Sequence, residues 1–211
     1  MKLVTGSKNV SSWTMRAWIV MRYFAIPFEE VKVVLNRSDT AQCIARYSPS
    51  GRIPCLVLDD QVVWDSMSIC EYLAEQFPDK TLWPQDTKAR AHARSICAEM
   101  HAGFSDLRRV LHLDICAREA AAGQHALDIV EVRRDVQRIE QIWEACLMQY
   151  EGPFLFGGFS IADAYFIPVM LRFRTYGLAV ASQAVADYMD RIERLGPVQE
   201  WIAEAAREQR R

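Results

Sequence analysis

The spacing of apolar residues divides the chain into two parts. Through residue 76, short runs of β-forming residues alternate with segments of helical period, and from residue 87 onward almost every segment has helical period. Strands are predicted over residues 2–5, 31–35, 55–58 and 62–64, and helices over 12–24, 38–47 and 66–76. This order suits a mixed sheet with helices on its faces, so the first part is predicted to be an α/β unit.

The second part is predicted to be all-helical. One or two long helices are expected over residues 87–122, and further helices over 127–150, from Ser160 onward, over 187–194 and over 197–208. Ser160 and Asp163 fit the capping box that begins a helix. The apolar stripe of the first long segment is Ile96, Met100, Phe104, Leu107 and Leu111. We therefore expect a first domain over residues 1–78, a linker over 79–86 and a helical domain over 87–211.

Composition and charge narrow the class of partner. The 211 residues are 51% hydrophobic and 25% charged, with a formal net charge of −2. Such a chain has enough apolar residues for a sizeable core, and it has no basic surplus that would attract nucleic acid or an anionic membrane. Apolar runs fall far short of the ~20 residues that span a bilayer, and the first residues do not resemble a secretory signal. We expect a cytoplasmic protein.

Cysteine and histidine spacing gives no support for a metal or dithiol centre. The six cysteines stand at positions 43, 55, 70, 97, 116 and 146, without a Cys-x-x-Cys pair, and the four histidines are scattered. Most of the cysteines lie among apolar residues and are expected to be small buried hydrophobes.

Two serines stand where chemistry is favoured. Ser11 and Ser12 lie between the first predicted strand and the first predicted helix. Free backbone amides and the helix dipole favour an anion there, and a thiol held at this point would ionise below the pKa of ~8.5 of free cysteine. A serine hydroxyl can add a charge-assisted hydrogen bond to such a thiolate. The alternative is that one of the two serines merely caps the helix.

Two further segments have the character of binding loops. Pro54 opens a strand and is compatible with a cis bond, and a bend there exposes the backbone N–H and C=O of Ile53 to a peptide-like ligand. Asp65 and Ser66 precede a helix, where the amides and the Ser66 hydroxyl suit a carboxylate and Asp65 can pair with an ammonium group. Together these segments offer a binding site for a thiolate, an unpaired backbone edge and binding groups for an amino-acid end. These match the functional groups of glutathione, a γ-glutamyl-cysteinyl-glycine tripeptide.

On these residues the chain resembles the cytosolic glutathione transferases along essentially its whole length. Ser11-Ser12-Trp13-x-x-Arg16 is similar to the serine-type loop of zeta-like and related bacterial members, Arg52-Ile53-Pro54 to the cis-proline loop, and Asp65-Ser66 to the γ-glutamyl motif. The resemblance implies a thioredoxin-like first domain and an all-helical second domain. No cysteine precedes position 43, which disfavours the members that form mixed disulfides with glutathione.

The resemblance also implies roles for individual residues, with glutathione as co-substrate. Ser11 would stabilise the glutathione thiolate, with Ser12 as the alternative, and the backbone of Ile53 would bind the cysteinyl moiety. Asp65 and Ser66 would hold the γ-glutamyl end. The glycyl carboxylate would pair with Arg52, or otherwise with Arg37, Gln42 or Arg46.

From this resemblance we expect a homodimeric glutathione transferase that directs the thiolate onto small, mostly apolar electrophiles. The alternatives are a glutathione-dependent cis–trans isomerase of a maleyl-type diketo acid and a glutathione-binding or scaffold protein without catalysis. His101 is expected to be packed or hydrogen-bonded rather than a base. The electrophile pocket is expected between the domains, lined by Val10, Met15, Met100, Phe104, Arg108, Phe173 and Tyr176.

Overall fold

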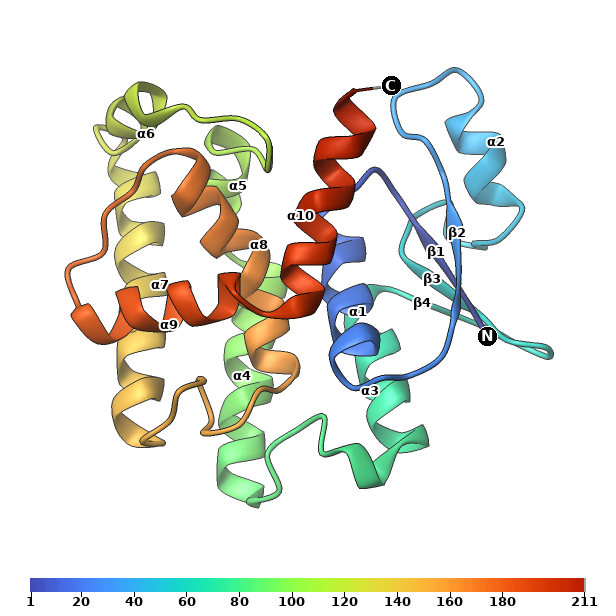
Figure 1. Cartoon of the computed structure of the whole chain (residues 1–211), viewed down its shortest axis with the longest axis horizontal. Helices are drawn as coiled ribbons and strands as arrows, with labels where there is room; N and C mark the ends of the chain where they lie inside the picture. Colours follow the sequence, from blue (N-terminus) through green and yellow to red (C-terminus); the bar gives the residue numbers. More distant parts are fainter. Residues whose placement is uncertain (211) are drawn as a thin grey trace.

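A four-stranded mixed sheet forms the N-terminal part of the computed structural model, which describes residues 1–210 (Figure 1). Strand β1 (Lys2–Thr5) pairs in parallel with β2 (Glu29–Lys32) and antiparallel with β3 (Cys55–Val57). Strand β4 (Val62–Trp64) continues the hairpin from β3, so the order across the sheet is β2-β1-β3-β4. This is the mixed sheet that the sequence predicts.

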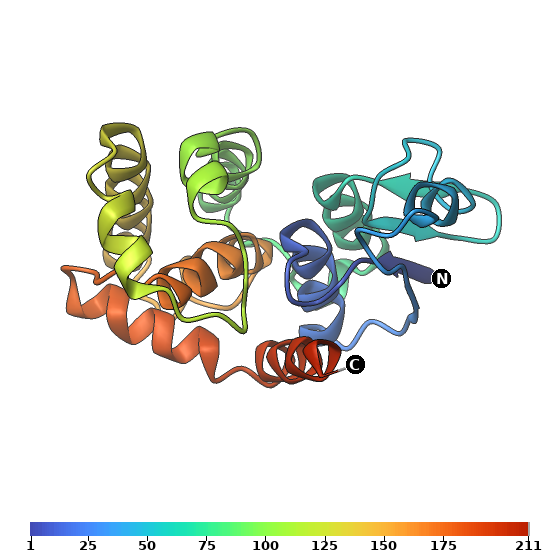
Figure 2. The ribbon, with the colours of Figure 1, turned by 90° about the horizontal axis from the view of Figure 1, so that it is seen from above.

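Helices cover both faces of the sheet. Helices α1 (Ser12–Tyr23) and α3 (Ser66–Gln76) lie on the face turned toward the rest of the molecule, and the short α2 (Thr40–Ala45) lies on the other face (Figure 2). Successive strand residues point to opposite faces. Leu3 accordingly packs in the main core with α1 and α3, whereas its neighbour Val4 packs against Ile44 of α2 in a smaller cluster.

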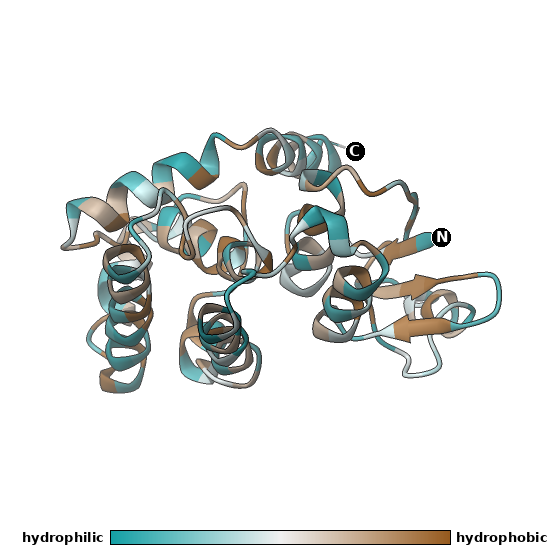
Figure 3. Ribbon diagram, turned by 90° about the horizontal axis from the view of Figure 1, so that it is seen from below, coloured by the Kyte–Doolittle hydropathy of each residue, from teal (hydrophilic) through white to brown (hydrophobic). Residues whose placement is uncertain are grey.

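The remaining chain is helical, as predicted. After one 3-10 turn, η1 (Pro78–Lys80), seven helices follow: α4 (Thr87–Ala102), α5 (Ser105–Val110), α6 (Ala120–Ala126), α7 (Val130–Gln149), α8 (Ile161–Thr175), α9 (Gln183–Glu193) and α10 (Gly196–Gln209). Along the helices hydrophilic and hydrophobic stretches alternate, whereas the hairpin strands β3 and β4 are hydrophobic (Figure 3). The domain limits at residues 78 and 87 stay a prediction. In the described part of the chain, no helix is both long enough and apolar enough to cross a membrane.

Helix α8 lies at the centre of the molecule and packs against both α1 and α4. Its start is the predicted capping box, in which Ser160 Oγ accepts the Ala162 N–H and Asp163 Oδ2 accepts the Ser160 N–H at 2.8 Å. Burial raises the pKa of Asp163 to about 6, although its hydrogen bonds from Leu155 and Ser160 oppose that rise. The first thirteen residues of the helix are all buried, so α8 joins the two parts of the chain through one core.

Two predicted elements differ from the structure. The second strand covers residues 29–32 rather than 31–35, because its polar residues pair along the edge of β1 while the chain leaves the sheet after Val33. The segment over residues 87–122 is broken after α4, where Phe104 has a φ of 58°. Between α5 and α6 the backbone binds other parts of the protein instead of continuing a helix, as in the 2.7 Å bond from the Glu119 N–H to the Thr175 carbonyl.

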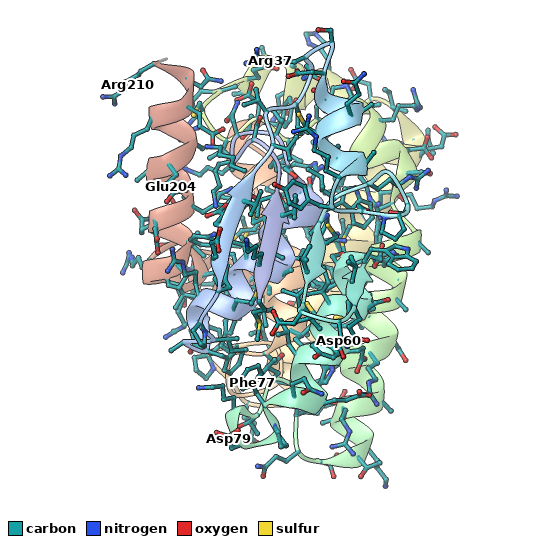
Figure 4. All side chains as sticks on the ribbon, turned by 90° about the vertical axis from the view of Figure 1, so that its right-hand side faces the viewer. Arg37, Asp60, Phe77, Asp79, Glu204 and Arg210 are labelled. Carbon is teal, nitrogen blue, oxygen red and sulfur yellow. The ribbon has the colours of Figure 1, made fainter. Side chains whose placement is uncertain are left out.

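A buried lysine joins the C-terminal helix to the loop that precedes α1. The Lys8 Nζ lies 2.6 Å from a carboxylate oxygen of Glu30 and 3.4 Å from one of Glu204, which is labelled on α10 in Figure 4. It also lies 4.1 Å from the ring centroids of Trp18 and Trp201. The Lys8 side chain has no exposed surface, so two carboxylates and two aromatic rings replace its hydration.

The charges of this cluster depend on one another. Burial alone would raise the pKa of Glu30, but hydrogen bonds from Lys8, Thr5 and Trp18 and the charge of Lys8 lower it below its usual value. A carboxylate whose pKa is lowered on folding stabilises the fold above its unfolded pKa, and this contribution is lost as the pH falls through the folded pKa. The ion pair therefore supports the fold at neutral pH and weakens in acid.

We predict that Lys8→Met lowers the free energy of unfolding at neutral pH by about 3 kcal/mol, because it leaves two half-buried carboxylates without their partner. Urea titration monitored by tryptophan fluorescence measures the change. The control Lys2→Met removes an exposed pair with Glu29 and is expected to change stability by less than about 1 kcal/mol. The difference between Lys8→Met and the unaltered protein should shrink below pH 4; a difference that is constant with pH would contradict the role of Glu30.

Candidate functional site

A cavity of about 560 Å³ opens where the sheet meets the helical part of the chain. Its walls come from the start of α1, the loop before β3, the end of β4 and the C-terminal end of α4. The lining residues are Trp13, Ser50, Arg52, Ile53, Pro54, Trp64, Asp65 and His101. Four of the five binding residues expected from sequence, Arg52, Ile53, Pro54 and Asp65, are thus brought together although they lie on two separate loops.

The loop before β3 supplies one wall. The Ile53–Pro54 peptide bond is cis, and Ile53 precedes Cys55, the first residue of β3 that pairs within the sheet. The backbone of Ile53 therefore lies at the cavity outside the sheet register. Arg52 is exposed and lines the same cavity, so it adds a positive charge at the rim.

Asp65 supplies a negative charge to the cavity. It is the N-cap of α3, with a φ of 73°, and its Oδ1 accepts the Met67 N–H at 2.7 Å. Its Oδ2 lies 3.4 Å from Nε2 of His101. Burial lowers the pKa of His101, and Arg16 and Arg108 act in the same direction while Asp65 opposes them. The histidine is thus held largely neutral beside a carboxylate that faces the cavity.

Ser66 does not line the cavity, and its predicted role at the γ-glutamyl end stays a prediction. Its side chain is completely buried, and its Oγ shares a 3.2 Å hydrogen bond with the Tyr165 hydroxyl. The cap of α3 is Asp65 rather than Ser66, because only the Asp65 side chain reaches a free amide of the first turn. The Ser66 hydroxyl therefore lies in the core between α3 and α8, away from the residues that line the cavity.

The two candidate serines have different surroundings. Ser11 is 8% exposed, and its Oγ accepts a 2.7 Å hydrogen bond from the Thr14 hydroxyl. Ser12 is half-buried, and its Oγ accepts a 2.9 Å hydrogen bond from Nη2 of Arg172. Neither serine lines the cavity, but Trp13, which comes directly after them, does. Their assignment as partners of a thiolate stays a prediction.

Asn9 fixes the loop that carries these serines. Its side-chain N–H donates to Asp114 at 2.9 Å, and its side-chain oxygen accepts the Cys116 N–H at 3.0 Å. Asp114 in turn accepts the Cys116 and Ala117 N–H groups. The segment between α5 and α6 thereby buttresses the serine loop from the helical part of the chain.

Three arginines surround the same loop. Arg16 is 2% exposed and its guanidinium stacks between the rings of Trp13 and Tyr165, at 4.6 and 4.5 Å. Arg108 lies 5.2 Å from the Trp13 ring and donates to backbone carbonyls at the end of α4. Among residues 1–210, neither these two nor Arg172 forms a salt bridge. Burial lowers the pKa of Arg16 to about 10, and each of the three arginines is protonated at neutral pH.

The residues predicted for the electrophile pocket lie elsewhere in this structure, and their role stays a prediction. None of its seven predicted residues lines the cavity. Met15, Met100 and Phe173 have at most 1% exposure, and Tyr176 has 5%, because all four pack in the main core. Phe104 borders a different cavity between α4 and α7, and Val10 is exposed to solvent. Arg108 lies behind Trp13 rather than at the cavity surface.

Sequence analysis missed three aromatic walls. Trp13 and Trp64 border the cavity, and His101 packs edge-on against Trp13 with ring centroids 5.0 Å apart. Trp64 is 46% exposed although it stands at the end of a strand. The signal in the sequence that could have identified Trp64 is its position directly before the predicted binding residues Asp65 and Ser66. His101 packs as expected, and it does so at the edge of the site.

Comparison with known proteins identifies the class to which this arrangement belongs. Residues 10–76 match the family model of the glutathione S-transferase N-terminal domain. A probable maleylacetoacetate isomerase of Caenorhabditis elegans is 28% identical over 174 residues, which cover 81% of this chain and 78% of that protein. A stringent starvation protein A homolog of Haemophilus ducreyi is 23% identical, covering 91% of this chain and 85% of the homolog.

Solved structures show the same fold over nearly the whole length. A glutathione transferase homolog from Burkholderia GL BGR1 with bound glutathione has a TM-score of 0.74 at 22% identity and covers 98% of both chains. A zeta-class maleyl pyruvate isomerase has a TM-score of 0.73 at 21% identity, covering 95% of this chain and 96% of the isomerase. The protein has the glutathione transferase fold, with a thioredoxin-like N-terminal part and a helical C-terminal part. Within this fold, residues 10–76 are the part of the chain that matches the glutathione S-transferase N-terminal domain.

We predict that Asn9→Ala lowers the free energy of unfolding by about 1–2 kcal/mol, because both partners of its side chain lose a hydrogen bond. Hydrogen exchange of residues 111–117 should rise most. Asn9→Asp is the matched variant: it places a carboxylate against Asp114 and should destabilise more at neutral pH, with partial recovery near pH 4. Equal exchange in all three proteins would show that Asn9 does not hold this segment.

Proposed function

We propose that the protein is a glutathione transferase that binds glutathione in the 560 Å³ cavity and directs its thiolate onto a small electrophile. The observation that carries this proposal is the convergence of Arg52, Ile53 and Asp65 on one cavity beside the start of α1. The sequence predicts binding groups for a tripeptide at these same residues, although nothing in the sequence alone places them side by side. The family membership of residues 10–76 supports the same ligand.

Each end of glutathione has a chemically matched partner in this site. The ammonium group of the γ-glutamyl end would pair with Asp65, whose side chain is 44% exposed, and the glycyl carboxylate with Arg52. The backbone of Ile53 would pair with the cysteinyl unit as an added strand does. These contacts would place the thiol near Trp13 and the serine loop.

The site favours the anionic form of the thiol. Ser11 or Ser12 would donate a hydrogen bond to the thiolate, since a serine hydroxyl is no general base near neutral pH. The start of α1 and the three arginines around the loop add a positive field. The thiolate then forms a bond to an electrophilic carbon, and the leaving group departs with its electron pair.

The alternatives differ in the step after thiolate formation. A maleyl-type isomerase would add the thiolate reversibly and release glutathione unchanged, and the similarity to a probable maleylacetoacetate isomerase favours testing it. A glutathione-binding or scaffold protein would bind without turnover. Activity assays with a panel of aryl halides and maleyl diketo acids separate the transferase, the isomerase and the non-catalytic protein.

We further propose that the transferase is a cytoplasmic homodimer.

The first test concerns the serines. Ser11→Ala and Ser12→Ala should leave glutathione binding mostly intact, while the one that removes the thiolate partner lowers activity near pH 6.5 with a chromogenic aryl halide about tenfold, equivalent to one pKa unit of the bound thiol. The measurement is kcat/KM against pH. Full activity in both variants would exclude a serine from thiolate stabilisation.

The second test concerns Asp65. Asp65→Asn keeps an N-cap side chain for α3 but removes the charge, so glutathione should bind about tenfold more weakly, or about 1.4 kcal/mol, with little change in melting temperature. Calorimetric titration with glutathione measures this loss. Asp60→Asn is the control because Asp60 lies on the exposed turn of the same hairpin (Figure 4) and does not line the cavity. Unchanged affinity in Asp65→Asn would contradict the assignment.

A further inference from the structure

The guanidinium of Arg172 is held by the backbone on two sides. It extends from α8, is 6% exposed, and donates from Nε to the Leu111 carbonyl at 2.9 Å and from Nη1 to the Pro168 carbonyl at 3.2 Å. Its remaining bond, from Nη2, goes to Ser12 Oγ at 2.9 Å. Two carbonyl contacts thus fix the plane of the group, and the third contact aims it at the serine loop 160 residues away in sequence.

This contact determines what the Ser12 hydroxyl can do. Arginine has hydrogen-bond donors but no acceptor, so the Ser12 hydroxyl cannot donate a hydrogen bond to Arg172. Its proton therefore stays available for another acceptor. A hydroxyl whose oxygen accepts a bond from a cation is polarised and becomes a better donor. Ser11 lacks this arrangement, because its oxygen accepts a bond from the neutral Thr14 hydroxyl.

The charge balance of this region calls for an anion. Arg16 from α1 and Arg108 from α5 both lower the pKa of Arg172 from α8, and Arg108 also lowers that of Arg16. Asp135 raises the pKa of Arg108, but no salt bridge within residues 1–210 compensates Arg16 or Arg172. Burial, together with Arg16 and Arg108, lowers the pKa of Arg172 to about 9, while Tyr176 opposes the shift. Uncompensated buried cations are unfavourable, and a thiolate bound at the start of α1 would offset that cost.

We propose that Arg172 is a positioning residue of the transferase reaction, which holds Ser12 so that its hydroxyl donates to the glutathione thiolate. The proposal rests on the proposed function, and it selects Ser12 over Ser11. The thiol proton leaves to solvent, and Ser12 keeps its own proton throughout. The thiolate sulfur then forms the bond to the electrophilic carbon.

The test compares two arginines of the same helix. Arg172→Gln should raise the pKa of enzyme-bound glutathione by about one unit, so kcat/KM with a chromogenic aryl halide falls about tenfold at acidic pH and approaches that of the unaltered enzyme at alkaline pH. The ultraviolet absorbance of the bound thiolate, titrated against pH, reports the same shift. Arg174→Gln is the control, because Arg174 is exposed and pairs with Glu193. It should leave the pKa unchanged.

Two further variants separate positioning from a structural role. Arg172→Lys keeps the charge and should restore part of the lower thiol pKa. Ser12→Ala should raise the thiol pKa as much as Arg172→Gln does, and more than Ser11→Ala does. The double variant Ser12→Ala/Arg172→Gln should raise it little further than either single change. Should Arg172→Gln fail to fold, the comparison of Ser12→Ala with Ser11→Ala still decides, because both variants keep the Arg172 guanidinium and its two bonds to backbone carbonyls.

Three results would overturn the inference. The first is a loss of kcat/KM in Arg172→Gln that is uniform across pH, which indicates structural damage alone. The second is an unaltered pH profile of kcat/KM in Arg172→Gln. The third is a larger rise of the thiol pKa in Ser11→Ala than in Ser12→Ala. Glutathione binding and turnover by the unaltered enzyme are measured first. If glutathione neither shifts the melting temperature of the unaltered enzyme nor is consumed by it, the proposed function fails. If the unaltered enzyme is active but the pH profile of Arg172→Gln is the same, only the role of Arg172 is refuted.

Discussion

The contact between Lys8 and α10 fixes the start of the serine loop, which lies beside the cavity. A lysine with no exposed surface must find its counter-charges inside the protein, and here they come from β2 and α10. Trp18 of α1 and Trp201 of α10 close the remaining sides of the ammonium group. One charge therefore sets the distance between the sheet, the first helix and the last helix, and the serine loop starts directly after it.

From that anchor the serine loop is held by contacts from the helical part of the chain. Asn9 binds the segment after α5, and Ser12 accepts a bond from Arg172 of α8. The opposite wall, with Ile53 and Asp65, is built by the sheet and the cap of α3. The cavity is therefore a product of both parts of the chain: one provides a polar clamp, and the other fixes the loop that faces it.

Sequence analysis predicted the features that depend on residues close together in the sequence. The capping box at Ser160, the strand after Pro54 and the start of α3 beside Asp65 could be predicted because the interacting residues lie within a few positions of one another. Arg172 and Lys8 could not be recognised, since their partners lie far away in the sequence and nothing local distinguishes them from surface cations. The residues predicted for the electrophile wall do not line the cavity for another reason: helical period shows that α4 and α8 have apolar faces, but not that Met100 and Phe173 face the core.

The position of α10 has a consequence for how the protein matures in the cell. The Lys8 amide donates to Glu208, 200 residues further along the chain, and Trp201 donates to the Lys8 carbonyl. During synthesis the first half of the chain emerges long before this helix exists, and such distant contacts form late. The sheet can take shape on the ribosome before α10 has emerged, whereas the loop before α1 gains its contacts with Trp201 and Glu208 only afterwards. The order of synthesis thus separates the formation of the sheet from the fixing of the loop beside it.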